Sequence, residues 1–259
     1  MNGYPLIIGH DGCEGSPPGT EASVQKAFEA GADIAEVDVR PTRDGVVILR
    51  HDKDIALTSG EHILISETSY EDIRDLEARG DLDFSQSGES ITRLDEVFEY
   101  VRGTNRLLNV DVKGKYSIDS ALRTIEGAGI RDNVMISGCD LDMAKYVRER
   151  CPEIDVVLNV DEESGSTVPL TGEIVEELYV SLVSAGCRGI NMDYRHCTAD
   201  TLRFFQNRHI PVCVWTVDDD DAIKRFIGLG VHTITTNRVS RAAGLRRHCR
   251  EYCREIVAT

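Results

Sequence analysis

Short apolar runs rich in β-branched residues alternate along the chain with longer stretches whose apolar positions recur at helical spacing. Runs of the first kind are typical of buried strands, and stretches of the second kind are typical of amphipathic helices. The pattern predicts strands at Leu6–Gly9, Ile34–Val39, Leu107–Val112, Val134–Ser137, Val156–Val160, Gly189–Met192, Val212–Thr216 and Thr233–Thr235. It predicts a helix after each strand, at Glu21–Ala30, Leu94–Val101, Ile118–Ala128, Leu141–Arg150, Ile174–Ala185, Ala199–Arg208, Asp220–Leu229 and Val239–Ile256.

The number of strand–helix units along the chain predicts the fold. Eight such units in 259 residues match a closed (β/α)₈ TIM barrel formed as one domain over residues 1–259. The alternative with the same rhythm is an open, doubly wound sheet. In the barrel, the active site lies at the C-terminal ends of the strands.

Two segments interrupt the regular alternation, both in the second unit. The Asp-Gly pair within "RDG" at 43–45 is a turn signal, and "VVILRHD" after it returns as another strand, which predicts a hairpin. From about 55 to 92 the chain is polar and acidic without a barrel strand. We expect this segment to form a small inserted lobe over the strand ends.

Charge and composition narrow the class of partner. The 45 Asp and Glu outnumber the 29 Lys and Arg, a formal net charge of −16, which argues against nucleic acid or an anionic membrane as partner. No run resembles a signal peptide or a membrane span, and the eight cysteines form no CxxC pair, so we expect a cytoplasmic protein with reduced thiols. A homo-oligomer remains possible, and an anionic substrate would need a local positive site.

Three acidic residues lie at the ends of neighbouring predicted strands. Glu36 and Asp38 are two positions apart in one strand, so their side chains point to the same side, and Asp111 comes from the next strand of the barrel. Carboxylates placed together repel one another unless a cation lies between them, and an all-oxygen set suits Mg²⁺ or Ca²⁺ rather than zinc. The alternative is an exposed hairpin with ordinary solvated acids.

Polar residues at other strand ends could complete an active site around these acids. His10 and His51 each end a strand and can exchange protons near neutral pH, and Lys113 supplies a positive charge for a phosphate oxygen. Each of these also has a structural alternative, such as an ion pair between Lys113 and Asp111. Trp215 is a candidate pocket wall, and Asn159 and Asn237, with Asn191 and Asp193, are candidate hydroxyl ligands.

The motifs that carry these residues resemble the glycerophosphodiester phosphodiesterase family, in matching order over nearly the whole chain. They are "GHDG" at 9–12, "PPGTEASVQKAFEAGADIAEVDVRPTRDGVVILRHD" at 17–52, "NVDVK" at 109–113, "VWTVD" at 214–218 and "TTN" at 235–237. The resemblance implies a TIM barrel that hydrolyses phosphodiesters with a divalent cation, with a place in glycerol and lipid metabolism. It also suggests that a neighbouring substrate hydroxyl attacks first, giving a cyclic phosphate that water opens.

Site roles follow from the same resemblance. It implies Glu36, Asp38 and Asp111 as metal ligands and His10 and His51 as the acid and base. It further implies that Lys113 contacts the phosphate and that Trp215 lines the pocket.

The chain departs from the family pattern at several positions. The usual His-Arg-Gly reads His10-Asp11-Gly12, Pro-Glu-Asn-Thr reads 17–20 as Pro-Pro-Gly-Thr, the third metal-binding Glu is Asp111, and the late Thr-Asp is Thr-Asn at 236–237. An arginine grips phosphate, whereas an ionised aspartate repels it and accepts hydrogen bonds from hydroxyl groups. We therefore expect Asp11 to contact substrate hydroxyl groups.

The leading hypothesis is thus a metal-dependent phosphodiesterase acting on a small soluble glycerophosphodiester. Asp11 and Gly19 raise the alternative of a sugar-bearing diester such as an agrocinopine-type opine. A non-catalytic ligand-binding barrel is an alternative of another class. A membrane-acting lyase of phospholipase D type is disfavoured by the acidic charge.

Overall fold

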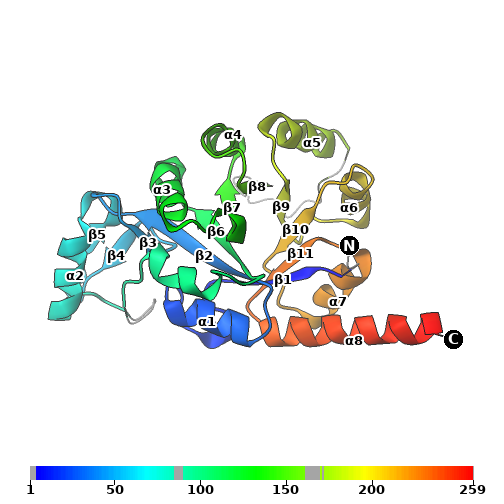
Figure 1. Cartoon of the computed structure of the whole chain (residues 1–259), viewed down its shortest axis with the longest axis horizontal. Helices are drawn as coiled ribbons and strands as arrows, with labels where there is room; N and C mark the ends of the chain where they lie inside the picture. The colour runs from blue at the N-terminus through cyan, green and yellow to red at the C-terminus, as the bar shows by residue number, and fades with distance from the viewer. Residues whose placement is uncertain (1–3, 85–89, 161–169, 171, 259) are drawn as a thin grey trace.

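The computed structural model describes residues 4–84, 90–160, 170 and 172–258, with the backbone alone for 250–258. Residues 85–89 of the predicted insertion lie outside this range. Within it, the chain forms a ring of strands surrounded by helices (Figure 1).

Eight parallel strands in the described part of the chain form a closed barrel. They are β1 (Leu6–Gly9), β2 (Ile34–Pro41), β6 (Leu107–Val112), β7 (Val134–Cys139), β8 (Asp155–Asn159), β9 (Gly189–Asp193), β10 (Val212–Trp215) and β11 (Thr233–Thr236). Strand β1 pairs in parallel with both β11 and β2, which closes the ring. The closed (β/α)₈ barrel is therefore confirmed, and the open doubly wound sheet is wrong.

Helices follow the strands and cover the outside of the barrel. The α-helices of this layer are α1 (Glu21–Glu29), α3 (Ile118–Ala128), α4 (Leu141–Arg150), α5 (Glu173–Ala185), α6 (Ala199–Gln206), α7 (Asp220–Leu229) and α8 (Val239–Ala258). Four of them, α1, α4, α6 and α7, begin at side-chain caps; at α1, for example, Thr20 accepts from the backbone N–H of Ser23, and at α4 Asp140 accepts from that of Met143. Strand and helix bounds agree with the predictions to within two residues.

One predicted helix has a different form. The chain over Leu94–Tyr100 is the 3₁₀-helix η3 instead of an α-helix. A 3₁₀-helix rises about 2.0 Å per residue, against about 1.5 Å for an α-helix. The same residues therefore reach further along the barrel on their way from the insertion back to β6. Further 3₁₀ turns are η1 (Cys13–Gly15), η4 (Lys115–Ser117) and η5 (Arg131–Asn133).

The predicted hairpin and insertion form a distinct lobe beside the barrel, at the left of Figure 1. Strand β3 (Val47–Leu49) pairs antiparallel with β2 and adds to its edge. Beyond it lie β4 (Asp54–Ala56), β5 (His62–Leu64), the 3₁₀-helix η2 (Ile65–Glu67) and α2 (Tyr70–Arg79). These elements share a small core of Ile48, Ile55, Ile65, Ile73, Leu82 and Ile91, apart from the main core. Ile48 of β3 thus anchors the lobe to the barrel.

Register between the strands places the acidic residues side by side. Strand β2 pairs with β6 so that Glu36 lies opposite Asn109 and Asp38 opposite Asp111. Alternation of side chains turns Glu36 and Asp38 to one face of β2 and Asn109 and Asp111 to one face of β6, and all four line the same cavity. Among the described residues, none of the helices is long and apolar enough to cross a membrane.

Candidate active site

A cavity of about 470 Å³ lies at the C-terminal ends of the barrel strands. Most of the residues predicted for the site line it: His10, Glu36, Asp38, His51, Asp111, Lys113, Asn159 and Trp215. They come from six different strands or the loops that follow them, so only the closed barrel brings them together. Asp11 and Asn237 are not among the lining residues.

Three carboxylates meet on one side of this cavity. Glu36, Asp38 and Asp111 each offer an oxygen, and these oxygens lie within 4.8 Å of one another. Burial, reinforced by the charges of Asp38 and Asp111, raises the pKa of Glu36 well above its usual value. Burial and repulsion therefore oppose the ionised form of Glu36, and a cation bound among the three carboxylates would relieve both.

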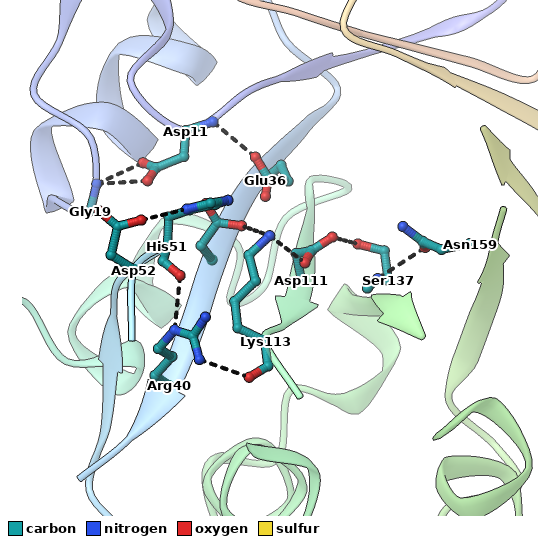
Figure 2. A network of polar contacts seen from close by, with 12 residues as sticks. Asp11, Gly19, Glu36, Arg40, His51, Asp52, Asp111, Lys113, Ser137 and Asn159 are labelled. Atoms are coloured by element: carbon teal, nitrogen blue, oxygen red, sulfur yellow. Dashed lines mark hydrogen bonds and ion pairs between the residues drawn. The ribbon is translucent and has the colours of Figure 1, made fainter. Parts of the chain in front are cut away.

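Lys113 is the one cation that contacts the cluster among the described residues. Its Nζ lies 2.7 Å from Oδ1 of Asp38 and 2.8 Å from Oδ1 of Asp111 (Figure 2). Although burial lowers it, the carboxylates of Asp111 and Asp38 raise the pKa of Lys113 above its usual value. Lys113 thus stays charged and balances one of the three carboxylates. The hydrogen bond that Glu36 accepts in the described structure comes from the backbone N–H of Asp11.

Two polar atoms of the cavity lining have no hydrogen-bond partner in the described structure. Asn109 Oδ1 and Trp215 Nε1 are both buried and unpaired, although both residues line the cavity. A buried polar atom without a partner is costly, so such atoms point to a missing ligand. Asn109 lies beside Glu36 and offers an oxygen to a cation, whereas Trp215 offers a proton to an oxygen. The donor set therefore fits a hard, oxygen-bound cation together with an oxygen-rich substrate.

Asp111 is held in place by strand β7. Ser137 Oγ donates to Asp111 Oδ2 at 2.9 Å, while Lys113 occupies the other oxygen. The next residue is Gly138, with φ of +75°, where a Cβ would lie 2.5 Å from Asp111 Oδ1. Glycine is needed at this position because of the positive φ and because a side chain would collide with Asp111. Its N–H donates to Asn159 Oδ1 at 3.0 Å, which turns that oxygen toward the backbone (Figure 2).

His10 is oriented by a chain of hydrogen bonds from the other end of the sequence. Its Nδ1 lies 3.1 Å from Oδ1 of Asn237. The Asn237 amide donates in turn to Asp218 Oδ2 at 2.8 Å, so its carbonyl oxygen faces the histidine. Because that oxygen only accepts, Nδ1 of His10 carries the proton and Nε2 is left for the cavity. Although burial opposes it, hydrogen bonds from Asn237 and Thr236 lower the pKa of Asp218, which keeps this anchor ionised.

His51 is held differently, at the exposed rim. Its Nδ1 lies 2.9 Å from Oδ1 of Asp52, and its side chain is 70% exposed. The hydrogen bond from His51 lowers the pKa of Asp52, so the partner of His51 is a carboxylate and that of His10 is a neutral amide. In the described part of the chain, each ring is held through Nδ1 and no hydrogen bond is formed at Nε2. The two rings differ in the charge of the group that holds them.

Asp11 does not face the cavity, contrary to the expectation that it contacts substrate. Its two carboxylate oxygens accept from the backbone N–H of Gly19, at 2.9 and 2.7 Å, and the residue is only 8% exposed. At Gly19, φ is +71° and a Cβ would lie 2.8 Å from the carbonyl oxygen of Leu49. Asp11 thus holds the loop after β1, and its own N–H donates to Glu36.

Asp11→Asn should change how stability depends on pH. Burial raises the pKa of Asp11 to about 6, from 3.8, against the opposing hydrogen bond from Gly19. The native state then holds its proton more tightly than the unfolded chain, so stability falls as pH rises through this window and the penalty remains above it. We expect the free energy of unfolding of wild type, minus that of the variant, to fall by about 2 kcal/mol between pH 4 and pH 7.

Urea unfolding at each pH, with no divalent cation added, measures this difference. Asp44→Asn is the matched control, because a hydrogen bond from Thr42 lowers the pKa of Asp44 and the corresponding difference should rise with pH. A difference for Asp11→Asn that does not change with pH would contradict the buried position of its carboxylate.

Several residues of the site were not predicted. Asn109 could have been found, because it lies two positions before Asp111 on the same side of one strand. Ser137 and Gly138 act through other residues, and no local pattern marks them; Asp218 ends the quoted motif "VWTVD", but its contact with Asn237 is not visible in the sequence.

The chain is similar to the proteins of one family over most of its length. The model of the glycerophosphoryl diester phosphodiesterase family matches residues 10–241. A glycerophosphodiester phosphodiesterase of Caldanaerobacter subterraneus subsp. tengcongensis is 24% identical over 90% of this chain and 93% of its own length. Another from Arabidopsis thaliana is 25% identical over 97% of this chain and 76% of its own.

Solved structures show the same fold. The Thermotoga maritima glycerophosphodiester phosphodiesterase superposes with a TM-score of 0.73 at 24% identity, covering 93% of this chain and 98% of that one. An Oleispira antarctica phosphodiesterase, in complex with the product sn-glycerol-3-phosphate, gives 0.74 at 19% identity, covering 93% and 96%. The family match extends over most of the chain, from His10 to the start of α8. The protein therefore belongs to the glycerophosphoryl diester phosphodiesterase family, whose members are phosphoric diester hydrolases.

Proposed function

We propose that this protein hydrolyses a small glycerophosphodiester to an alcohol and a phosphomonoester, with a divalent cation and two histidines. The observation that carries the proposal is the shared cavity: three carboxylates, a lysine and both histidines line it at the strand ends. The product in the Oleispira antarctica complex, sn-glycerol-3-phosphate, supports this class of substrate.

Glu36, Asp38 and Asp111 would hold the cation, either Mg²⁺ or Ca²⁺. Their convergence within 4.8 Å and the unpaired oxygen of Asn109 beside them support this assignment. When bound, the cation would supply Lewis-acid stabilisation of negative charge on the phosphate oxygens. Lys113, at the same wall of the cavity, would add a second positive charge for those oxygens.

The two histidines would divide acid and base work. We assign the base to His10, because its Nδ1–H is held by the neutral amide of Asn237 and its Nε2 is free to take a proton from the attacking hydroxyl group or water. We assign the acid to His51, because the carboxylate of Asp52 compensates the charge of a protonated ring. The proton of His51 then goes to the oxygen of the leaving alcohol as its bond to phosphorus breaks.

The alternative of a sugar-bearing diester as substrate loses its main support, the expected contact of Asp11 with substrate. Asp11 binds the backbone of Gly19 and does not line the cavity, so it is not positioned to select a sugar hydroxyl. Simple glycerophosphodiesters are therefore the substrates to test first.

Turnover of glycerophosphocholine tests the proposal. With Mg²⁺ or Ca²⁺ added to purified protein, we expect release of choline and glycerol 3-phosphate, measured by coupled enzymatic assay. Glycerol 3-phosphate alone is the control, and it should yield no inorganic phosphate because the site acts on diesters. Tight binding of the cation without turnover of any diester would instead support the non-catalytic barrel.

A further inference from the structure

A second cavity, open to solvent and of about 870 Å³, lies between the β2–β3 hairpin, the lobe and helix α3. Four basic side chains line it: Arg40, Arg43, Lys53 and Arg123. We call it the basic cavity. In a chain with a formal net charge of −16, such a concentration of positive charge is unexpected.

Three of these four cations have no carboxylate partner within 4.0 Å among the described residues. Arg43 pairs with Asp72 at 3.3 Å, but no ion pair forms at Arg40, Lys53 or Arg123. Arg123 donates only to the hydroxyl of Ser120, at 3.0 Å. Unpaired cations gathered around one cavity repel one another, and an anionic ligand bound there would relieve that repulsion.

Asp44, the acid in the lining, forms no ion pair within 4.0 Å with these cations in the described structure, although, besides the hydrogen bond from Thr42, the charge of Arg43 contributes to its lowered pKa. Asp44 Oδ1 accepts from the hydroxyl of Thr42 at 2.6 Å and from the backbone N–H of Tyr70 at 2.9 Å. The same hydrogen bond from Thr42 lowers the pKa of Asp44, so it is ionised but directed into the hairpin turn. The cavity therefore keeps a net positive lining.

Arg40 separates the basic cavity from the catalytic one. Its Nε donates to the carbonyl oxygen of His51 at 2.8 Å, and its Nη1 donates to that of Lys113 at 3.1 Å (Figure 2). Both His51 and Lys113 line the catalytic cavity. Arg40 also donates to the hydroxyl of Tyr116, whose ring, 51% exposed, lines the basic cavity. A substrate group leaving past His51 would therefore meet this second hollow next.

We propose that the basic cavity is a subsite for a phosphate monoester group carried by the leaving alcohol. This inference rests on the proposed function, in which His51 protonates that alcohol. Arginine and lysine bind phosphate through charge-assisted hydrogen bonds. Tyr116 and Leu64 offer an apolar surface to the carbon skeleton of the leaving alcohol that carries the phosphate. The net negative charge of the rest of the protein excludes long polyanions, which leaves a small phosphorylated molecule as ligand.

Two ligands that differ only in this group test the proposal. Calorimetry with metal-free protein should show glycerophosphoinositol 4-phosphate binding at least about tenfold more tightly than glycerophosphoinositol, the effect of one charge-assisted hydrogen bond. In the Lys53→Ala/Arg123→Ala double variant the difference should disappear. Both side chains are exposed, so the fold should survive, and Arg40 is left intact because it holds the backbone of His51. Arg203→Ala, an exposed arginine of α6, is the matched control and should keep the difference.

The second arm measures kcat/KM for both diesters with the cation present. We expect wild type to prefer the phosphorylated diester by a similar factor, and the double variant to turn over both equally. Equal binding of the two ligands by wild type would overturn the subsite, whatever the turnover. Preferential binding without turnover of either diester would leave the subsite standing and refute the proposed function. Inorganic phosphate binding as tightly as the phosphorylated diester, with no preference in kcat/KM, would show a free-anion site and overturn the assignment to substrate.

Discussion

His10→Ala should lower kcat for glycerophosphocholine by about two to four orders of magnitude, the usual contribution of a positioned acid or base. The expected loss is this large because Nε2 of His10 is the free imidazole nitrogen that the Asn237 carbonyl leaves available in the cavity. His51→Ala should cause a loss of the same size. Steady-state kinetics at saturating cation measures both.

An activated substrate separates the two roles. A diester that releases p-nitrophenolate needs no proton on its leaving group, so His51→Ala should recover most of its lost rate on it, while His10→Ala should not. His62→Ala is the matched control, because His62 lies on the lobe with Nδ1 3.4 Å from Asp54 Oδ2, a similar pair away from the cavity. Recovery in His10→Ala alone would reverse the assignment, and full activity of both variants would refute it.

Removal of the cation should abolish turnover. We expect protein treated with a chelator to be inactive and to recover when Mg²⁺ or Ca²⁺ is added. Asp38→Asn should raise the cation concentration for half-maximal activity by about a hundredfold or more, the cost of removing one partner from a buried charge pair. Asp38 is the better choice than Glu36, because Glu36 also accepts the backbone hydrogen bond of Asp11.

Calorimetry with the cation alone gives a readout that does not depend on turnover. Asp193→Asn is the matched control, since Asp193 is a buried aspartate at the end of β9 that pairs with Arg195 outside the cavity lining. It should leave cation affinity unchanged. Full activity of wild type in excess chelator would contradict a role for these carboxylates as metal ligands.

The fold was largely predictable because its rules are local. Periodicity places a strand or helix from a few neighbouring residues, and repeated units with buried strands leave few topologies. What periodicity could not show was the form of η3, since a 3₁₀-helix and an α-helix of seven residues have nearly the same apolar spacing. Nor could it show that Ile48 belongs to the lobe core and not to the barrel core.

The site was predictable where chemistry and strand position coincide. Glu36 and Asp38 follow the two-residue period, and their register with β6 brings Asp111 beside them. Asp11 was misplaced because its direction depends on the left-handed backbone of Gly19, eight residues later, and on the crowding there by Leu49. Asn237 was assigned to substrate because nothing local shows that an amide 227 residues away faces His10.

The position of Lys113 bears on when the protein becomes active after it is made. With its ammonium group placed between Asp38 and Asp111, the acidic cluster already contains one tethered counter-ion, which compensates part of its negative charge without a bound cation. Under the cation dependence proposed above, synthesis and activation would be separate events. Molecules made when divalent cations are scarce would accumulate as a folded, silent reserve, and we expect a rise in cation concentration to activate that reserve without new protein synthesis.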